Sequence, residues 1–443
     1  MQITELRIDD RSKLCAVRTN KFKRNSLFLT RVLDIAPETT PCDVILCRVL
    51  GRKTADYPSS AALSRRCEEL YGAVPDCFVN FLGDKLIMVL YADFVSDSVM
   101  GGGDGIIRGT MSLLASIWRA PVLDKTGLFP ADEVARARQG VCNDIRSSEN
   151  DPGAYASRKC RELTCAGYPQ GYSVKVDDVG RVTPERLTAR YRELLPGSFG
   201  AFYVGDSPEL VAGLLPVYFG EGCVGGFTPL NPHPVLPRDG VQRVDEARRV
   251  GQGKLCMAFH GAALMQNKDD YYATLMSVEV FGGSPVAKLF MNVRERLGLC
   301  YHCSAVYNKL GGIIYVSSGV APENRERAER EILAQLDELQ KGNITDAELR
   351  AARLSLINSA RQIEDNPYSV WSFSEHRLRL GLDCSLERHI ERIGRVTVAE
   401  IQRATASWTL GVEFFLHPDG ECADVSDGGD DETCGNEEGE YED

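Results

Sequence analysis

The chain has 443 residues, of which 43% are hydrophobic and 26% are charged, an ordinary composition for a globular protein. This composition excludes collagen-like, low-complexity and small disulfide-scaffold proteins, and the length predicts about two to four domains. The 15 cysteines are odd in number and irregularly spaced, which favours reduced, mostly buried thiols over a disulfide framework.

The net charge of −12 is concentrated at the C-terminus. Residues 419–443 contain twelve Asp and Glu and no Lys or Arg, which leaves 51 acidic and 51 basic residues in the rest of the chain. A neutral body has no excess positive charge to bind nucleic acid or an anionic membrane. We expect the acidic segment, which has few apolar residues, to be disordered.

The sequence contains no sign of a membrane segment. Its strongest apolar stretch covers only residues 86–92, far short of the roughly 18 residues of a spanning helix. The N-terminus is charged where a signal peptide would need an apolar core. We therefore expect a cytoplasmic protein that does not act on membranes.

Two short motifs occur twice in the chain at almost the same offset. The sequence GRVT at residues 180–183 returns at 394–397, and ENDP at 149–152 is echoed by EDNP at 364–367. The offset is almost half the length of the chain. A period this long indicates duplicated domains, because the units of a solenoid run about 20–50 residues.

The local pattern around the repeats supports a duplication. Thr183 and Thr397 each fit the N-cap of a short helix, and an apolar strand follows in each copy, at 199–204 and 412–416. We therefore predict two homologous domains separated by a proline-rich linker. The predicted boundaries are 1–225 for the first domain, 226–242 for the linker, 243–418 for the second domain and 419–443 for the acidic tail.

Further elements of the second half can be read in chain order. Strand pairs grouped apart from long helices favour an α+β fold, with a mostly antiparallel sheet in each domain and helices packed on one face. The expected elements are a strand at 254–259, a helix at 269–281, a second helix at 286–297 after a Gly-Gly-Ser-Pro break, paired strands at 301–307 and 312–319, and two helices at 323–341 and from 345 toward 366.

The residues alone do not define a self-sufficient active site. The six histidines are scattered, and neither H-E-x-x-H nor H-x-x-E-H occurs, so the helix of a zinc peptidase is absent. The chain also has no P-loop and no G-x-S-x-G nucleophile motif.

Cys300 and Cys303 have the C-x-x-C spacing of half a zinc site or a redox pair. The chain has no second C-x-x-C that could complete a zinc site. On a regular strand, residues three apart point to opposite faces of the sheet. We therefore expect these cysteines to be ordinary structural residues.

Residues 282–301, GGSPVAKLFMNVRERLGLCY, resemble the insulinase/pitrilysin (inverzincin) family of zinc peptidases, which includes the mitochondrial processing peptidase and small bacterial two-subunit members. The second domain of that family commonly has Gly-Gly, then Leu-Phe, then Arg-Glu, with a Tyr seven residues after the Arg. Arg294 and Tyr301 match that spacing. In the first half, YPSS at 57–60 and LYGA at 70–73 resemble the zinc-less bacterial subgroup. The resemblance implies a fold like that of mitochondrial processing peptidase (LuxS/metallohydrolase-like).

The chain departs from the family where active members bind zinc. Their H-x-x-E-H helix lies just before a Gly-Thr that corresponds to residues 53–54, so its ligand and base positions are occupied here by Val44, Cys47 and Arg48. The distal Glu ligand corresponds to Ala137. Catalytic zinc sites need three protein ligands. The resemblance therefore implies that this chain binds no metal or cofactor of its own.

The resemblance gives Arg294 and Tyr301 a role toward substrate. In the family, such a pair hydrogen-bonds the substrate carbonyl near a zinc, which here would be held by a homologous partner subunit. Donors of this kind stabilise the developing oxyanion by a few kcal/mol. The family also binds its peptide as a strand added to a sheet edge.

We therefore expect the non-catalytic subunit of a heterodimeric zinc metallopeptidase in a bacterial cytoplasm, inactive without its zinc-bearing partner. Peptides are the expected ligands, and nucleic acid and membranes are not. Two alternatives remain open: a scaffold or peptide-binding module with no proteolysis, and a peptidase with a relocated metal site.

Overall fold

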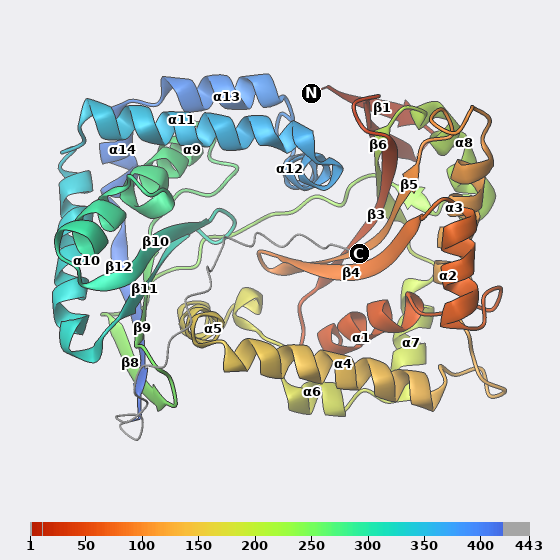
Figure 1. Ribbon diagram of the computed structural model, residues 1–443, viewed down its shortest axis with the longest axis horizontal. Coiled ribbons are helices and arrows are strands. Elements are labelled where there is room, and N and C mark those ends of the chain that lie inside the picture. Colours follow the sequence, from red (N-terminus) through yellow and green to blue (C-terminus); the bar gives the residue numbers. More distant parts are fainter. Residues whose placement is uncertain (1, 11, 420–443) are drawn as a thin grey trace, which may run out of the picture.

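The computed structural model describes residues 2–10 and 12–419, so the expected disorder of the acidic tail falls, apart from Asp419, outside the described residues. The chain forms two lobes, each built on one β-sheet (Figure 1). The first half contains β1 (Ile3–Arg7), β2 (Lys13–Arg18), β3 (Arg24–Asp34), α1 (Thr40–Leu50), α2 (Ser60–Glu69), β4 (Val74–Leu82), β5 (Lys85–Val95), α3 (Gly105–Arg119), α4 (Ala131–Asn150), α5 (Pro152–Thr164), η1 (Pro169–Gly171), α6 (Val176–Gly180), α7 (Pro184–Leu194), β6 (Phe199–Gly205), α8 (Pro208–Phe219) and β7 (Val224–Gly225).

The second half follows a segment, 226–241, that has no helix or strand. Its elements are β8 (Gln242–Arg248), β9 (Lys254–His260), α9 (Lys268–Val278), η2 (Glu279–Gly283), η3 (Phe290–Arg296), β10 (Cys300–Asn308), β11 (Ile313–Val320), η4 (Pro322–Asn324), α10 (Arg325–Gln340), α11 (Asp346–Gln362), η5 (Ile363–Asp365), α12 (Pro367–Arg379), α13 (Leu386–Arg395), α14 (Val398–Thr405) and β12 (Thr409–Pro418).

Both sheets are mixed but mostly antiparallel. The first has the order β1-β2-β6-β3-β5-β4, with β7 beside β6, and the second has the order β10-β11-β9-β12-β8. Among the described residues, the parallel pairs are β2–β6, β6–β7 and β8–β12, and the others are antiparallel. Strands β4 and β10 each lie at the end of their sheet, so each has one edge that no other described strand pairs with. The predicted α+β fold class is confirmed.

The repeated motifs occupy matching places in the two halves. Thr183 and Thr397 are the N-caps of α7 and α14, and each side chain accepts a hydrogen bond from the backbone three residues later. Asp151 and Asn366, from the second repeat, cap α5 and α12 in a similar way. Both copies therefore begin equivalent helices, because a side-chain acceptor there satisfies a backbone N–H that the helix leaves unpaired.

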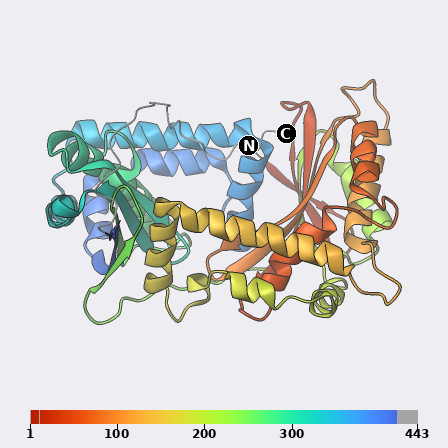
Figure 2. The ribbon, with the colours of Figure 1, turned by 60° about the horizontal axis from the view of Figure 1, so that its bottom comes forward.

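Helices α5 and α12 pack on the sheet of the opposite half. Tyr155 and Cys160 of α5 pack with Phe414 and other buried residues of the second sheet. Trp371 of α12 stacks on Phe28 of the first sheet, with ring centroids 4.6 Å apart. Figures 1 and 2 show α11 and α12 along one side of the molecule and α4 and α5 along the other, joining the lobes. The prediction placed helices on one face of each sheet. The structure shows that the opposite face of each sheet is also covered, by a helix from the other half.

Within residues 2–10 and 12–419, no helix has both the length and the apolar content that a membrane crossing requires.

Candidate functional site

The positions that correspond to the zinc motif lie on two neighbouring helices, α1 and α4. Cys47 and Ala137 are both 3% exposed, and Val44 is half-buried. Arg48 on α1 forms an ion pair with Asp144 on α4. An arginine–carboxylate contact thus joins the helices at the positions that the family resemblance assigns to the zinc motif.

The side chains at these positions do not fit zinc. Val44 and Ala137 have no donor atom, and the guanidinium of Arg48 is cationic. Interaction with the Cys77 thiol, together with burial, raises the pKa of Cys47 well above its ordinary value, so Cys47 is a protonated thiol at neutral pH. Zinc binds the thiolate, not the thiol. In the part of the chain that the structure describes, no group of three or more His, Cys, Asp or Glu side chains could hold a metal ion.

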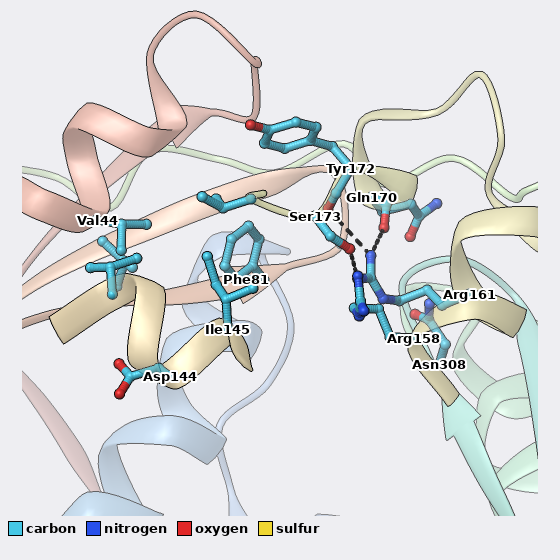
Figure 3. Close-up of a pocket in the computed structure, with 14 residues that line it drawn as sticks. Val44, Phe81, Asp144, Ile145, Arg158, Arg161, Gln170, Tyr172, Ser173 and Asn308 are labelled. Carbon is cyan, nitrogen blue, oxygen red and sulfur yellow. Dashed lines mark hydrogen bonds between the residues drawn. The ribbon is translucent and has the colours of Figure 1, made fainter. Parts of the chain in front are cut away.

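A cavity of about 580 Å³ lies next to these positions, between the two lobes (Figure 3). At its polar end Arg161 donates hydrogen bonds to the backbone carbonyl of Gln170 and, at 2.7 Å, to Oγ of Ser173. The opposite end is apolar and contains Val44 and Phe81. The lining residues are Val44, Val79, Phe81, Gly83, Val141, Asp144, Ile145, Arg158, Arg161, Gln170, Tyr172, Ser173, Val174 and Asn308.

One wall of the cavity is the edge strand β4. Val79 and Phe81 are two residues apart, so both side chains point into the cavity from the same face. Phe81 is 52% exposed, and among the described strands β4 pairs with β5 alone. A free edge beside an apolar cavity can accept an extended peptide as an added strand. Sequence analysis missed this wall, because the alternation along β4 shows two faces but not which one lines a cavity.

Arg294 and Tyr301, hereafter the Arg–Tyr pair, lie side by side. Arg294 is on the π-helix η3, and Tyr301 is near the start of β10. The guanidinium carbon of Arg294 lies 5.6 Å from the centre of the Tyr301 ring and 4.5 Å from that of Phe290. Such distances are within the range of cation–π attraction. The Tyr301 residue is 76% exposed and the Arg294 side chain 36% exposed, so a second molecule can reach both.

The turn between η3 and β10 explains how the pair comes together. Gly298 has φ +58°, in the left-handed region, and its N–H donates to the carbonyl of Arg294 at 2.9 Å. The N–H of Leu299 donates to the carbonyl of Val293 at 3.1 Å. The bond from Gly298 to Arg294, with Gly298 in the left-handed region, is an αL C-cap, which ends a helix and lets the chain reverse. The reversal brings Tyr301 back beside Arg294.

The Arg–Tyr pair is separate from the cavity. Tyr301 stands at one end of β10, and Asn308, which lines the cavity, is the last residue of the strand. A strand rises about 3.3 Å per residue, which places the two ends roughly 23 Å apart. The structure thus brings Arg294 and Tyr301 together but does not join them to the zinc-motif positions of the same chain.

The expectation that Cys300 and Cys303 point to opposite faces is wrong. Cys300 pairs with Val320 and Cys303 with Ser318, so three steps along β10 match two along β11. This is a β-bulge, which inserts one extra residue into a strand. Because Ser318 and Val320 share a face, the cysteines opposite them share it too.

A family model described as "Peptidase M16 inactive domain" matches residues 207–356. The probable inactive metalloprotease YmfF of Bacillus subtilis (strain 168) is 24% identical over 409 residues, which cover 90% of this chain and 94% of that protein. The residues that the family model matches include the Arg–Tyr pair.

Solved structures show the same fold. A conserved protein from Enterococcus faecalis V583 superposes with a TM-score of 0.82 and 24% identity, covering 94% of this chain and 98% of the other. A peptidase M16 inactive domain from Pseudomonas fluorescens superposes with a TM-score of 0.75 and 16% identity over the same shares. The resemblance to the insulinase/pitrilysin (M16) family of peptidases, as an inactive-type member without the H-x-x-E-H motif, is therefore confirmed.

Proposed function

We propose that this chain is the non-catalytic subunit of a heterodimeric M16 peptidase. It would form half of a peptide chamber and present the Arg–Tyr pair to a homologous subunit that holds the zinc. The observation that carries the proposal is the geometry of Arg294 and Tyr301: they lie in contact, Tyr301 is exposed, and both are far from the metal-less positions of their own chain.

The surface around the pair supports a partner. Large exposed apolar side chains on a monomer are informative when they gather in one place, because such patches mark interaction sites. Here several of them follow one another along the segment that contains η3 and β10. The exposed hydrophobic residues of this segment are Val286, Met291, Leu297, Tyr301 and Val306.

The chemistry of the pair suits a carbonyl that becomes an oxyanion. A guanidinium and a phenol both donate hydrogen bonds, and Arg294 is held against two aromatic rings. Donors that are fixed before the reaction stabilise developing negative charge without reorganising. The free edge of β4 would align the backbone of the peptide, as strand addition does in other complexes.

The experiment uses this chain co-expressed with an H-x-x-E-H homologue encoded in the same genome, and a quenched fluorescent peptide library as the substrate. We expect Arg294→Ala and Tyr301→Phe each to lower hydrolysis on the order of 10²-fold, with the complex still assembled on gel filtration. Arg296→Ala is the matched control, because Arg296 lies on the same helix and pairs with Glu331 at the surface. That variant should keep full turnover.

Two results would overturn the proposal. Unchanged turnover in both pair variants would remove the assigned role of Arg294 and Tyr301. A complex that binds the library peptides and never cleaves them would favour the alternative, a peptide-binding module without proteolysis. Elemental analysis adds an independent readout: we expect zinc in the complex and none in this chain purified alone.

A further inference from the structure

Cys300 and Cys303 form a dithiol whose two members differ in acidity. Interaction with the Cys303 thiol is the largest influence on Cys300 and, with help from the Arg294 guanidinium, lowers the pKa of Cys300 to about 7 against the effect of burial. The pKa of Cys303 is raised, because Cys300 interacts with it and because it is buried. Near neutral pH a large fraction of Cys300 is therefore thiolate, the form that acts as a nucleophile.

The two thiols also differ in access. Cys300 is half-buried and Cys303 is 3% exposed, while Tyr301 and His302 between them are exposed. A small reagent can therefore reach the thiol of Cys300 before that of the buried Cys303. This is the arrangement of an attacking thiol and a resolving thiol.

A metal site does not explain the arrangement. His302 lies between the cysteines, but its Nε2 is 3.1 Å from Oγ of Ser317. Among the described residues no third ligand completes a group that could hold a metal ion with these cysteines. Thiol–disulfide chemistry needs only the two sulfurs.

We propose that Cys300 and Cys303 form a reversible disulfide by exchange with a low-molecular-weight disulfide. The Cys300 thiolate attacks one sulfur of the small disulfide, which forms a mixed disulfide and releases one small thiolate that takes up a proton. Cys303 then loses its proton to solvent and attacks Sγ of Cys300, which releases the second small thiol. Two protein thiols are oxidised, one small disulfide is reduced to two thiols, and no further oxidant is needed.

The disulfide would close a loop around Tyr301. Because Tyr301 sits within the bulge, the bond would fix the backbone that carries its ring beside Arg294. Oxidation would thus change the position or mobility of the Arg–Tyr pair. This consequence rests on the proposed function, whereas formation of the disulfide does not.

The test treats the purified full chain with oxidised glutathione near neutral pH and maps tryptic peptides by mass spectrometry. Residues 297–309 form one tryptic peptide that carries both cysteines. We expect this peptide to become lighter by two hydrogen atoms and to regain them on reduction. Cys303→Ser should stop at a glutathione adduct on Cys300, and Cys300→Ser should leave Cys303 unmodified.

Cys223 provides the internal control, because it is also half-buried but burial raises its pKa to about 11. After allowing for the lower nucleophilicity of the more acidic thiol, we expect iodoacetamide to alkylate Cys300 about 10²-fold faster than Cys223 near neutral pH. A 297–309 peptide that stays reduced, or equal alkylation of the two cysteines, would overturn the proposal.

A separate measurement addresses the link to the Arg–Tyr pair. Peptide hydrolysis by the co-expressed complex should change on oxidation in the wild type and not in Cys300→Ser/Cys303→Ser, whose basal activity should match that of the reduced wild type. If the disulfide forms and hydrolysis does not respond, the link is refuted while the redox pair and the role of the Arg–Tyr pair both stand.

Discussion

Arg379 anchors α12, the helix of the second half that packs on the first sheet. Its side chain is 1% exposed, and its Nε donates to Oε1 of Glu375 at 2.8 Å. The other guanidinium nitrogens donate to Oγ1 of Thr30 on β3, at 2.8 Å, and to the carbonyl of Thr228, at 3.0 Å. One buried cation therefore joins the second half, the first sheet and the segment between them.

The change Arg379→Met should be strongly destabilising, because Glu375, only 3% exposed, would keep a buried charge without its partner. Removing one member of a buried ion pair costs about 3–5 kcal/mol of folding free energy, or roughly 10²–10⁴ in the folding equilibrium. Replacing both members by apolar groups leaves no buried charge and is often close to neutral. We therefore expect Arg379→Met/Glu375→Met to recover most of the loss.

The single variant should also show a characteristic pH dependence. Burial raises the pKa of Glu375 above its ordinary value of 4.5, and Arg379 opposes that shift. Without Arg379 the pKa rises further. A carboxyl whose pKa is higher in the folded than in the unfolded state makes the fold less stable as pH rises above the unfolded value. Arg379→Met should therefore lose stability more steeply than the wild type as pH increases from about 4.5 toward neutrality, and the double variant should not.

Urea denaturation followed by tryptophan fluorescence and circular dichroism is the assay. Trp371 stacks on Phe28 across the two halves, so its fluorescence reports the docking of α12. An Arg379→Met protein that unfolds at the wild-type urea concentration would refute the reasoning. So would a double variant as unstable as the single one, since the loss would then not come from an unpaired charge.

Two further substitutions test the packing around the site. Asp43, which is fully buried on α1, accepts hydrogen bonds of 2.7 and 3.1 Å from Arg190, so Asp43→Asn should cost about 3 kcal/mol in denaturation experiments, and a loss below about 1 kcal/mol would contradict this. Gly261 has φ +92°, and a Cβ there would lie 2.1 Å from the backbone oxygen of Ser407, so Gly261→Ala should lower the melting temperature by several degrees. Gly213, in the exposed interior of α8 with open space around it, is the matched control, and Gly213→Ala should stabilise by about 0.5–1 kcal/mol; equal effects at the two glycines would contradict the clash.

Local structure was predictable where neighbouring residues determine it. The caps predicted at Thr183 and Thr397 are present, because an N-cap depends on contacts within one turn of helix. The paired strands predicted at 301–307 and 312–319 correspond to β10 and β11. The helix predicted at 286–297 is only partly confirmed. The structure forms the π-helix η3 over Phe290–Arg296, and not an α-helix over the whole range.

The site was predictable only in part. Counting along the family motif locates Val44 and Arg48 but does not show that Arg48 pairs with Asp144, which is almost a hundred residues away. The spacing of Cys300 and Cys303 misled for a similar reason. A bulge is fixed by how a strand packs against its neighbour, and a single strand's sequence carries no signal of that pairing.

The packing of α5 and α12 on opposite sheets gives one of the two repeated motifs a physical meaning. In each half, the ENDP/EDNP repeat begins, with a capping side chain and a proline, a helix that packs on the sheet of the other half. Moving one half relative to the other would therefore expose Trp371 on one side and Tyr155 on the other. Fully burying a large apolar side chain is worth about 1.5–3 kcal/mol, so such a motion is costly on both sides at once. We infer that the edge of β4 and the Arg–Tyr pair keep a fixed position relative to each other. A partner subunit would therefore bind them as parts of one rigid surface.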